Sequence, residues 1–266
     1  MKIARVKTEQ GAVYATPQPD GTFLLLEGND LKDLQPTSKI VEGTILAPLS
    51  PPSIYCIGLN YRAHAVETGN RVNEFPVVFI KTPTTVQHPG GPIVLPNPTA
   101  TETVDFEAEL AVVIGQDCKN VSRENALDFV LGYTCANDVT ARNWQTSRGG
   151  GQFCRAKTFD TFCPLGPFIV TADEIPNPGQ LTISSRLNGT QMQKSTTADM
   201  IFDVPSLIEF LSLDTTLVAG TIILTGTPEG VGSVRDPAVY LQDGDVIEVE
   251  IENIRILANP VVSSVS

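Results

Sequence analysis

The chain is organised around one strand-like segment, Val104-Asp105-Phe106-Glu107-Ala108-Glu109-Leu110-Ala111-Val112-Val113-Ile114-Gly115. Successive side chains of a strand point to opposite faces, so Asp105, Glu107 and Glu109 are expected to share one face. Residues 111–114 are apolar on both faces, which indicates that the strand runs into a buried core. Carboxylates crowded at the mouth of such a strand repel one another unless water, basic side chains or a cation relieves them. Oxygen-only ligands suit a hard divalent ion such as Mg²⁺ or Ca²⁺; the alternative is an ordinary solvated strand face.

Strand-like patterns also dominate the chain on both sides of this segment. Twenty prolines and 21 glycines break it into short elements. The best helix candidates are residues 123–131 and 205–213. The pattern predicts a mainly β protein with short helices, of the α+β class. The predicted strands are residues 2–6, 22–26, 77–80, 106–114, 168–170, 181–187, 221–224 and 246–251.

Two domains of unequal size are expected. Residues 1–48 have the pattern of a small β-rich N-terminal domain. Residues 46–52 contain three prolines in seven positions and are interpreted as a connector. Residues 53–266 contain no comparable break, so they are expected to form one larger domain that carries the chemistry.

The composition excludes several classes of function. Eighteen basic residues against 30 acidic ones give a net charge of −12, which would repel nucleic-acid phosphates. The chain contains no apolar run of the roughly 18 residues that a membrane-spanning helix needs, and its first residues lack the apolar stretch of a signal peptide. The five cysteines are odd in number and include no Cys-x-x-Cys pair, which favours reduced thiols. We therefore expect a cytoplasmic protein without nucleic-acid or membrane partners.

A second carboxylate follows a mostly apolar run. Asp138 is followed four and seven residues later by Arg142 and Gln145, which share one face if the segment is helical. Asp138 could be a third metal ligand, and Arg142 could hold a substrate carboxylate through two hydrogen bonds. The alternative is a helix cap followed by a surface ion pair.

Histidine is scarce, which disfavours a multi-histidine zinc site. Of the two histidines, His88 lies in a turn, whereas His64 precedes Glu67 by three residues. In a helix these two side chains share a face, and a carboxylate bonded to one imidazole nitrogen raises the basicity of the other. Such a dyad can draw a proton from water. The alternative is an ordinary surface pair.

Two more segments have a functional interpretation beside a plain one. Lys157 stands among aromatic residues, either as a surface lysine or as a partly buried cation near a site. Residues 225–232 contain three glycines at the end of a predicted strand, where a ligand can approach the backbone closely. This segment lacks the Gly-Lys-Ser/Thr ending of a phosphate-binding loop.

Taken together and in this order, these stretches resemble the fumarylacetoacetate hydrolase family, in the branch of acylpyruvases and 2-hydroxyhepta-2,4-diene-1,7-dioate isomerases. The resemblance runs from about residue 53 to about residue 260. One departure stands near the C-terminus, where the family tends toward Glu-Gly-Ile-Gly and this chain has Glu252-Asn253-Ile254-Arg255. The matching stretches are Gly58-Leu59-Asn60-Tyr61 with His64 and Glu67, Phe79-Ile80-Lys81, Asp105 to Ala111, Asn137-Asp138 with Arg142 and Gln145, Lys157 to Asp160 with Pro164 to Pro167, and Thr225 to Pro228 with Gly230 to Gly232.

The resemblance implies a fold, a cofactor and a set of roles. The fold is a mixed β-sandwich roll that holds a divalent metal, usually Mg²⁺, with Mn²⁺ or Ca²⁺ as substitutes, and family members are commonly homodimers. The metal ligands would be Glu107, Glu109 and Asp138. The catalytic residues would be the dyad of His64 and Glu67, on a segment that acts as a lid, together with Lys157 beside the metal. The substrate contacts would be Asn60, Tyr61, Arg142, Gln145 and Thr227.

The resemblance also implies the reaction. The expected function is a Mg²⁺-dependent hydrolase that cleaves a C–C bond in a small anionic 2,4-dioxo acid, similar to acylpyruvate or fumarylpyruvate, through a metal-bound enolate. The alternative is a decarboxylase or a keto–enol tautomerase or isomerase, acting on a 2-oxo acid such as oxaloacetate or on a 2-hydroxyhepta-2,4-dienedioate-type compound. A non-catalytic binding protein on the same fold would have lost a ligand or the dyad, and all of these residues are present.

Overall fold

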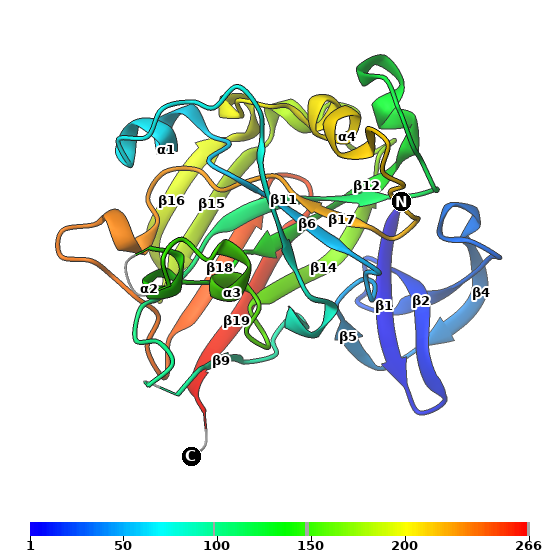
Figure 1. The fold of residues 1–266 in the computed structure, drawn as a ribbon. Coiled ribbons are helices and arrows are strands. Elements are labelled where there is room, and N and C mark those ends of the chain that lie inside the picture. Colours follow the sequence, from blue (N-terminus) through cyan, green and yellow to red (C-terminus); the bar gives the residue numbers. More distant parts are fainter. Residues whose placement is uncertain (98, 147–148, 265–266) are drawn as a thin grey trace.

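The computed structural model describes residues 1–97, 99–146 and 149–264 and is mainly β (Figure 1). The strands are β1 (Lys2–Thr8), β2 (Gly11–Pro17), β3 (Phe23–Glu27), β4 (Gln35–Val41), β5 (Thr44–Leu46), β6 (Ile54–Gly58), β7 (Val77–Lys81), β8 (Val86–Gln87), β9 (Ile93–Leu95), β10 (Val104–Asp105), β11 (Ala108–Ile114), β12 (Val130–Asn137), β13 (Thr140–Ala141), β14 (Cys163–Thr171), β15 (Thr182–Leu187), β16 (Thr190–Thr196), β17 (Ile222–Leu224), β18 (Val246–Ile251) and β19 (Arg255–Ser263). The α-helices are α1 (Arg62–Glu67), α2 (Arg142–Gln145), α3 (Phe153–Lys157) and α4 (Val204–Ser212). Short 3₁₀ helices are η1 (Leu31–Asp33), η2 (Pro83–Thr85), η3 (Arg123–Phe129), η4 (Pro178–Gln180), η5 (Thr197–Asp199) and η6 (Gly232–Val234). The predicted α+β class is therefore confirmed.

Two sheets enclose the core. The larger has the order β4-β3-β2-β1-β14-β12-β11-β17-β6-β7, and the smaller has the order β16-β15-β18-β19-β9. Buried side chains of both sheets meet in one cluster, where Val112 and Tyr133 of the larger sheet pack with Val249 and Leu257 of the smaller. Strands β11 and β12 are buried along their whole length because apolar side chains cover both faces. They form the rigid centre from which the functional residues extend.

The N-terminal strands continue the larger sheet. Strand β1 pairs with β14 through Lys2↔Val170 and Ile3↔Ile169. The first strands, coloured blue, lie at one side of the molecule, and α1, α2 and α3 lie at the other (Figure 1). The division at residue 48 stays a prediction, but the hydrogen-bonded ladder crosses it.

The carboxylate segment differs from its prediction as one continuous strand. Strand β10 ends at Asp105 and pairs with β13, whereas β11 begins at Ala108 and pairs with β12. Side chains interrupt the ladder between them: the Phe106 N–H donates to the Asp105 carboxylate, and the Glu107 N–H donates to the side-chain oxygen of Asn137. Asp105 consequently makes contacts of its own and does not join the other two carboxylates.

The two predicted helices had different outcomes. The segment predicted at residues 205–213 is α4, which begins after Asp203, whose carboxylate accepts the Ser206 N–H at 3.0 Å. The segment predicted as a helix at residues 123–131 forms the 3₁₀ helix η3 over residues 123–129. Residues 130 and 131 already belong to β12. Among the residues that the model describes, no helix has the length and apolar character to cross a membrane.

Candidate metal centre and active site

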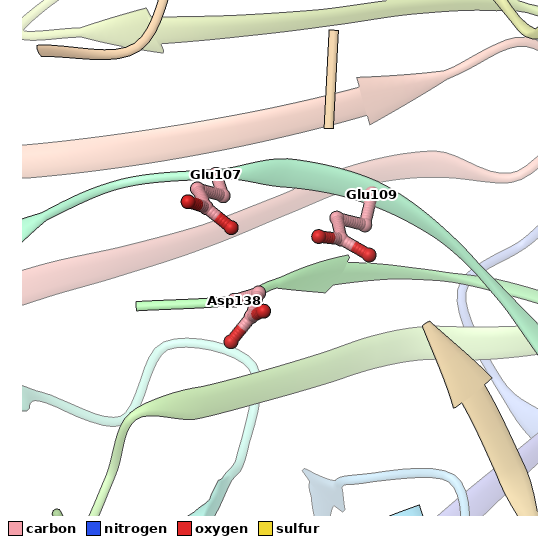
Figure 2. Close-up of side chains that lie close together, drawn as sticks. All are labelled: Glu107, Glu109 and Asp138. Carbon is pink, nitrogen blue, oxygen red and sulfur yellow. The ribbon is translucent and has the colours of Figure 1, made fainter. Parts of the chain in front are cut away.

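Three carboxylates gather at the end of the buried β11–β12 pair. Figure 2 shows Glu107 and Glu109 extending from one backbone segment toward Asp138 on its neighbour. One oxygen of each carboxylate lies within 4.8 Å of the others, and all three residues are at least 95% buried. The Asp138 N–H donates to the Glu107 carbonyl at 2.9 Å, so the backbone fixes this spacing. The structure thus brings together the three residues predicted as metal ligands.

Two buried lysines surround Asp138. The Lys157 ammonium donates to Glu107 Oε2 and to Asp138 Oδ2, each at 2.7 Å. Lys81 donates to the other Asp138 oxygen and to the Val139 carbonyl. Burial alone would lower the pKa of Lys157, but the charges of Asp138 and Glu107 outweigh it and raise the pKa. Lys157 is therefore held as a cation rather than as a nucleophilic amine.

The Glu109 carboxylate differs from Glu107 and Asp138 in its charge environment. Its carboxylate accepts the Gly226 N–H at 2.7 Å, and no lysine or arginine within the described ranges forms an ion pair with it. Burial, and then the charges of Asp138 and Glu107, raise the pKa of Glu109 well above its ordinary value. Burial also raises the pKa of Glu107, but Lys157 and Arg142 outweigh it and lower that pKa overall.

The donor set fits a hard divalent cation. Around the triad, four carboxylates face three cationic side chains, which leaves one negative charge in excess when every group is ionised. The excess lies at Glu109, beside two other carboxylates, and every donor atom is oxygen, the ligand that Mg²⁺, Mn²⁺ and Ca²⁺ prefer. The carboxylates are Asp105, Glu107, Glu109 and Asp138, and the cations are Lys81, Arg142 and Lys157.

The Arg142 side chain is fixed at the edge of the triad. Its Nε donates to Asp105 Oδ2 at 2.8 Å, its Nη1 donates to Gln145 Oε1 at 2.9 Å, and its Nη2 lies 2.8 Å from Glu107 Oε1. Burial would lower the pKa of Arg142, but Asp105 and Glu107 outweigh it and raise the pKa. The four-residue helix α2 thus presents a rigid guanidinium and a side-chain amide together.

The predicted dyad is present on α1. His64 Nδ1 lies 3.0 Å from Glu67 Oε2, and the histidine is 9% exposed. The Gly230 N–H donates to both Glu67 oxygens, at 3.0 and 3.2 Å. Because Nδ1 faces the carboxylate, the second ring nitrogen of His64 is the one available for proton transfer.

Residues 225–234, which we term the amide loop, connect these parts through backbone N–H groups. Gly226 donates to Glu109, Gly230 donates to Glu67, and Gly232 and Ser233 donate to Asp105 at 2.8 and 2.9 Å. Two of these glycines lie in the left-handed backbone region that favours glycine. Gly226 and Gly230 have φ of +97° and +94°, and a Cβ would lie 2.7 Å from Asn60 Cβ and 2.4 Å from the Met192 carbonyl oxygen, respectively.

One cavity of about 680 Å³ collects most of the predicted site residues. Its lining combines charged and polar side chains with apolar ones, which is typical of a small-molecule site. Asp138 lies behind this lining, wholly buried. The predicted residues in the lining are His64, Glu67, Glu107, Glu109, Arg142, Gln145, Lys157 and Thr227. The remaining lining residues are Ile57, Gly58, Leu59, Thr68, Asn70, Phe79, Thr146, Phe153, Val231, Ser233, Val234 and Tyr240.

The predicted substrate contacts Asn60 and Tyr61 lie outside this lining. Asn60 is wholly buried; its amide donates to the Phe202 and Thr225 carbonyls, and its oxygen accepts the Phe202 N–H. Tyr61 is also wholly buried and belongs to the core between the two sheets. Both residues are adjacent to the dyad in sequence, but their side chains hold β6 and α1 in place.

Three residues beside the site were given no role by the sequence. Lys81 ends the apolar strand β7 and shares a strand face with Phe79, so alternation could have revealed a buried lysine that needs an acidic partner. Asp105 was taken as part of the carboxylate face. Gln193 donates to Thr227 Oγ1 at 2.7 Å from a strand remote in sequence, and no local pattern marks it.

Comparisons with known proteins identify the family to which the chain belongs. The model of the fumarylacetoacetate (FAA) hydrolase C-terminal family matches residues 53–262. An oxaloacetate tautomerase of Xenopus laevis, described as mitochondrial, is 46% identical over 220 residues, which cover 82% of this chain and 68% of that protein. The crystal structure of 5-carboxymethyl-2-hydroxymuconate delta-isomerase from Mycobacterium smegmatis has a TM-score of 0.87 and 36% identity, over 99% of this chain and 100% of that one. Fumarylacetoacetate hydrolase from Exiguobacterium antarcticum has a TM-score of 0.88 and 35% identity over the same shares. With the family model spanning most of the chain, and with these relatives, the protein belongs to the fumarylacetoacetate hydrolase family.

Proposed function

We propose that this protein is a divalent-metal-dependent tautomerase that interconverts the keto and enol forms of a small 2-oxo acid, with oxaloacetate as the first substrate to test. One observation carries the proposal: the dyad of His64 and Glu67 lines the same cavity as Glu107, Glu109 and Lys157. A base and a strongly charged oxygen-binding centre are the two parts that enolisation needs. The names of the Xenopus tautomerase and the mycobacterial isomerase support this reaction over the hydrolysis favoured by sequence alone.

The cationic side chains bind and orient the substrate. Arg142 offers a planar guanidinium suited to a carboxylate, and Gln145 adds an amide on the same helix. Lys157 supplies a fixed positive charge next to Glu107, where negative charge develops on the 2-oxo oxygen as a proton leaves the adjacent carbon. A divalent ion held by Glu107, Glu109 and Asp138 would supply Lewis-acid stabilisation of that charge.

His64 moves the proton. Its free ring nitrogen takes a proton from the carbon next to the 2-oxo group, and the electron pair of that C–H bond becomes the C–C double bond. The π pair of the C=O bond moves to the oxygen, which takes that proton from His64 to give the enol, and the reverse sequence regenerates the keto acid. Glu67 accepts a hydrogen bond from His64 Nδ1–H and so stabilises the imidazolium that forms, while the Gly230 N–H holds Glu67 in place.

The test is the rate at which enol oxaloacetate is lost, followed by its ultraviolet absorbance. We expect catalysis with Mg²⁺, none after chelation, and a fall of about 10²–10⁴-fold in His64→Ala. His88→Gln is the matched control, because His88 bonds to the Ala47 N–H outside the cavity lining. A wild-type rate equal to the uncatalysed rate with Mg²⁺ bound would refute the proposal.

Hydrolysis of an acylpyruvate is the second candidate. Its support is the 680 Å³ cavity, which has room for a water beside a larger substrate, and a dyad able to activate that water. The hydroxide would add to the distal carbonyl, the C–C bond would break, and the pyruvate carbon would take up a proton. Pyruvate release from acetylpyruvate measures this activity, and pyruvate release from oxaloacetate in the tautomerase assay measures decarboxylation.

A further inference from the structure

We propose that Asp105 is a positioning residue for substrate recognition, because its carboxylate fixes the Arg142 guanidinium and the amide loop at the same time. Through both, Asp105 positions part of the cavity wall without lining the cavity itself. The role rests on the proposed function in one respect, namely that Arg142 binds the substrate.

Both oxygens of Asp105 are fully engaged. Oδ1 accepts the N–H groups of Phe106 and Gly232, each at 2.8 Å. Oδ2 accepts the Ser233 N–H at 2.9 Å and the Arg142 Nε–H at 2.8 Å. The residue is wholly buried and stands outside the cavity lining. Four donors around one carboxylate fix its position, so it can serve as an anchor for the groups that it holds.

The neighbouring backbone is shaped for this carboxylate. A Cβ at Gly232 would lie 2.6 Å from Asp105 Oδ1 and 1.8 Å from the Val239 carbonyl oxygen. Only glycine lets the amide loop approach so closely. The next residues, Ser233 and Val234, face the cavity, so the anchor of this segment lies one residue away from its contact surface.

Of the two acidic partners of Arg142, Asp105 is the one that is not a proposed metal ligand. Glu107, the other partner, is also a proposed metal ligand and already bonds Lys157. With Nε on Asp105 and Nη1 on Gln145, the plane of the guanidinium is defined without Glu107. A defined plane matters because two-point binding of a carboxylate depends on it, and a misplacement of about 1 Å can cost roughly 100-fold in rate.

A double-mutant cycle tests the proposal with Asp105→Asn, Arg142→Lys and the double variant. We expect Asp105→Asn to raise KM for oxaloacetate about 30-fold, to change kcat less than about 3-fold, and to leave Mg²⁺ affinity unchanged. Because Asp105 acts through Arg142, the double variant is expected to be no worse than Arg142→Lys by more than about 3-fold. Asp203→Asn is the matched control: Asp203 also accepts a backbone N–H and an arginine, but on α4, and its kinetics should equal wild type.

A second readout needs no turnover. The Arg142 Nε–H, assigned in NMR spectra as the resonance missing from Arg142→Lys, should exchange slowly with solvent in the wild type and faster in Asp105→Asn where that variant folds. Fast exchange in the wild type, additive losses in the cycle, or an unchanged KM in a folded Asp105→Asn would each overturn the proposal. Absence of tautomerase activity in the wild type refutes the proposed function and leaves the exchange measurement to decide the Asp105–Arg142 anchor.

Discussion

The acidic triad and the dyad helix are built in different ways, although they share one cavity. Glu109 stands on β11, and Glu107 and Asp138 directly adjoin the ends of the buried β11–β12 pair, so the backbone pairing sets their spacing. The dyad stands on α1, a helix of six residues at the surface, in which Val66 is 82% exposed. Such a helix is far below the roughly 12–15 residues needed for stability alone, so tertiary contacts hold it.

Those contacts are few and specific. Arg62 donates to the Met200 carbonyl, Ala63 N–H donates to Asp199, and Glu67 accepts the Gly230 N–H. Removing one of these hydrogen bonds removes a large share of the contacts that position the dyad, whereas no single contact positions the triad. Metal binding and proton transfer should therefore be separable by mutation, and the substitutions below test that separation.

Removal of a ligand should have the largest effect. Glu109→Gln is expected to abolish tight Mg²⁺ binding and to lower activity by roughly 10³-fold or more. The reason is that it removes the carboxylate of the triad that forms no ion pair with a described lysine or arginine. Calorimetric titration with Mg²⁺ measures the binding. Mg²⁺ at about 100 times its Kd should stabilise the wild type by about 2.7 kcal/mol and this variant hardly at all. Glu102→Gln, an exposed neighbour, is the control; equal Mg²⁺ affinity in wild type and Glu109→Gln would contradict the assigned ligand set.

Loss of the dyad carboxylate should have a smaller and different effect. Glu67→Gln keeps the shape of the side chain but removes the charge that orients His64 and stabilises its protonated form. We expect kcat to fall about 10–100-fold with Mg²⁺ affinity unchanged. Steady-state kinetics and Mg²⁺ titration on the same sample measure both quantities. A parallel loss of Mg²⁺ affinity would show that dyad and triad are coupled.

Two matched glycine substitutions in the amide loop test whether metal binding and proton transfer can be changed separately. Gly226→Ala forces a Cβ against Asn60 beside Glu109, and Gly230→Ala forces one against the Met192 carbonyl beside Glu67. Each should destabilise the fold by about 1–3 kcal/mol, since both glycines have positive φ. Gly226→Ala should weaken Mg²⁺ binding about 10-fold, and Gly230→Ala should instead lower kcat about 10-fold. The same defect in both variants would mean that the loop responds as a whole.

The smallest effect is expected outside both regions, at Asp203. Burial raises the pKa of Asp203, but hydrogen bonds from Ser206 and Arg123 outweigh it and lower the pKa below its ordinary value. A carboxylate with a lowered pKa stabilises the fold above its unfolded pKa of about 3.9 and loses that contribution as pH falls through the folded pKa. Asp203→Asn should therefore cost about 0.5 kcal/mol at pH 7 and progressively less below about pH 4, as measured by urea unfolding. A difference that persists at low pH would assign the effect to packing.

The sequence predicted the site more completely than the strands that carry it. Spacing and resemblance brought out Glu107, Glu109 and Asp138, because their alternation and order survive in the structure. The continuous strand expected from Asp105 to Glu109 is broken at residues 106–107, and N–H groups about 127 residues away, in the amide loop, bind the Asp105 carboxylate. Asn60 was taken as a substrate contact for a similar reason: its partner Phe202 is remote in sequence. Local patterns reveal local geometry, whereas contacts between distant segments decide which polar side chains reach the cavity.

The amide loop has a consequence for how such a protein changes over evolutionary time. Its main-chain N–H groups donate hydrogen bonds to Glu67, Glu109 and Asp105, and every residue type except proline has such an N–H group. Its side chains at positions 231, 233 and 234 line the cavity and take no part in those hydrogen bonds. A lineage can therefore exchange those side chains, and with them the shape of the cavity wall, while the backbone contacts to the three carboxylates stay the same. The same ten residues therefore contribute side chains to the cavity lining and backbone N–H groups to the carboxylates. Substitution can change the first contribution without changing the second.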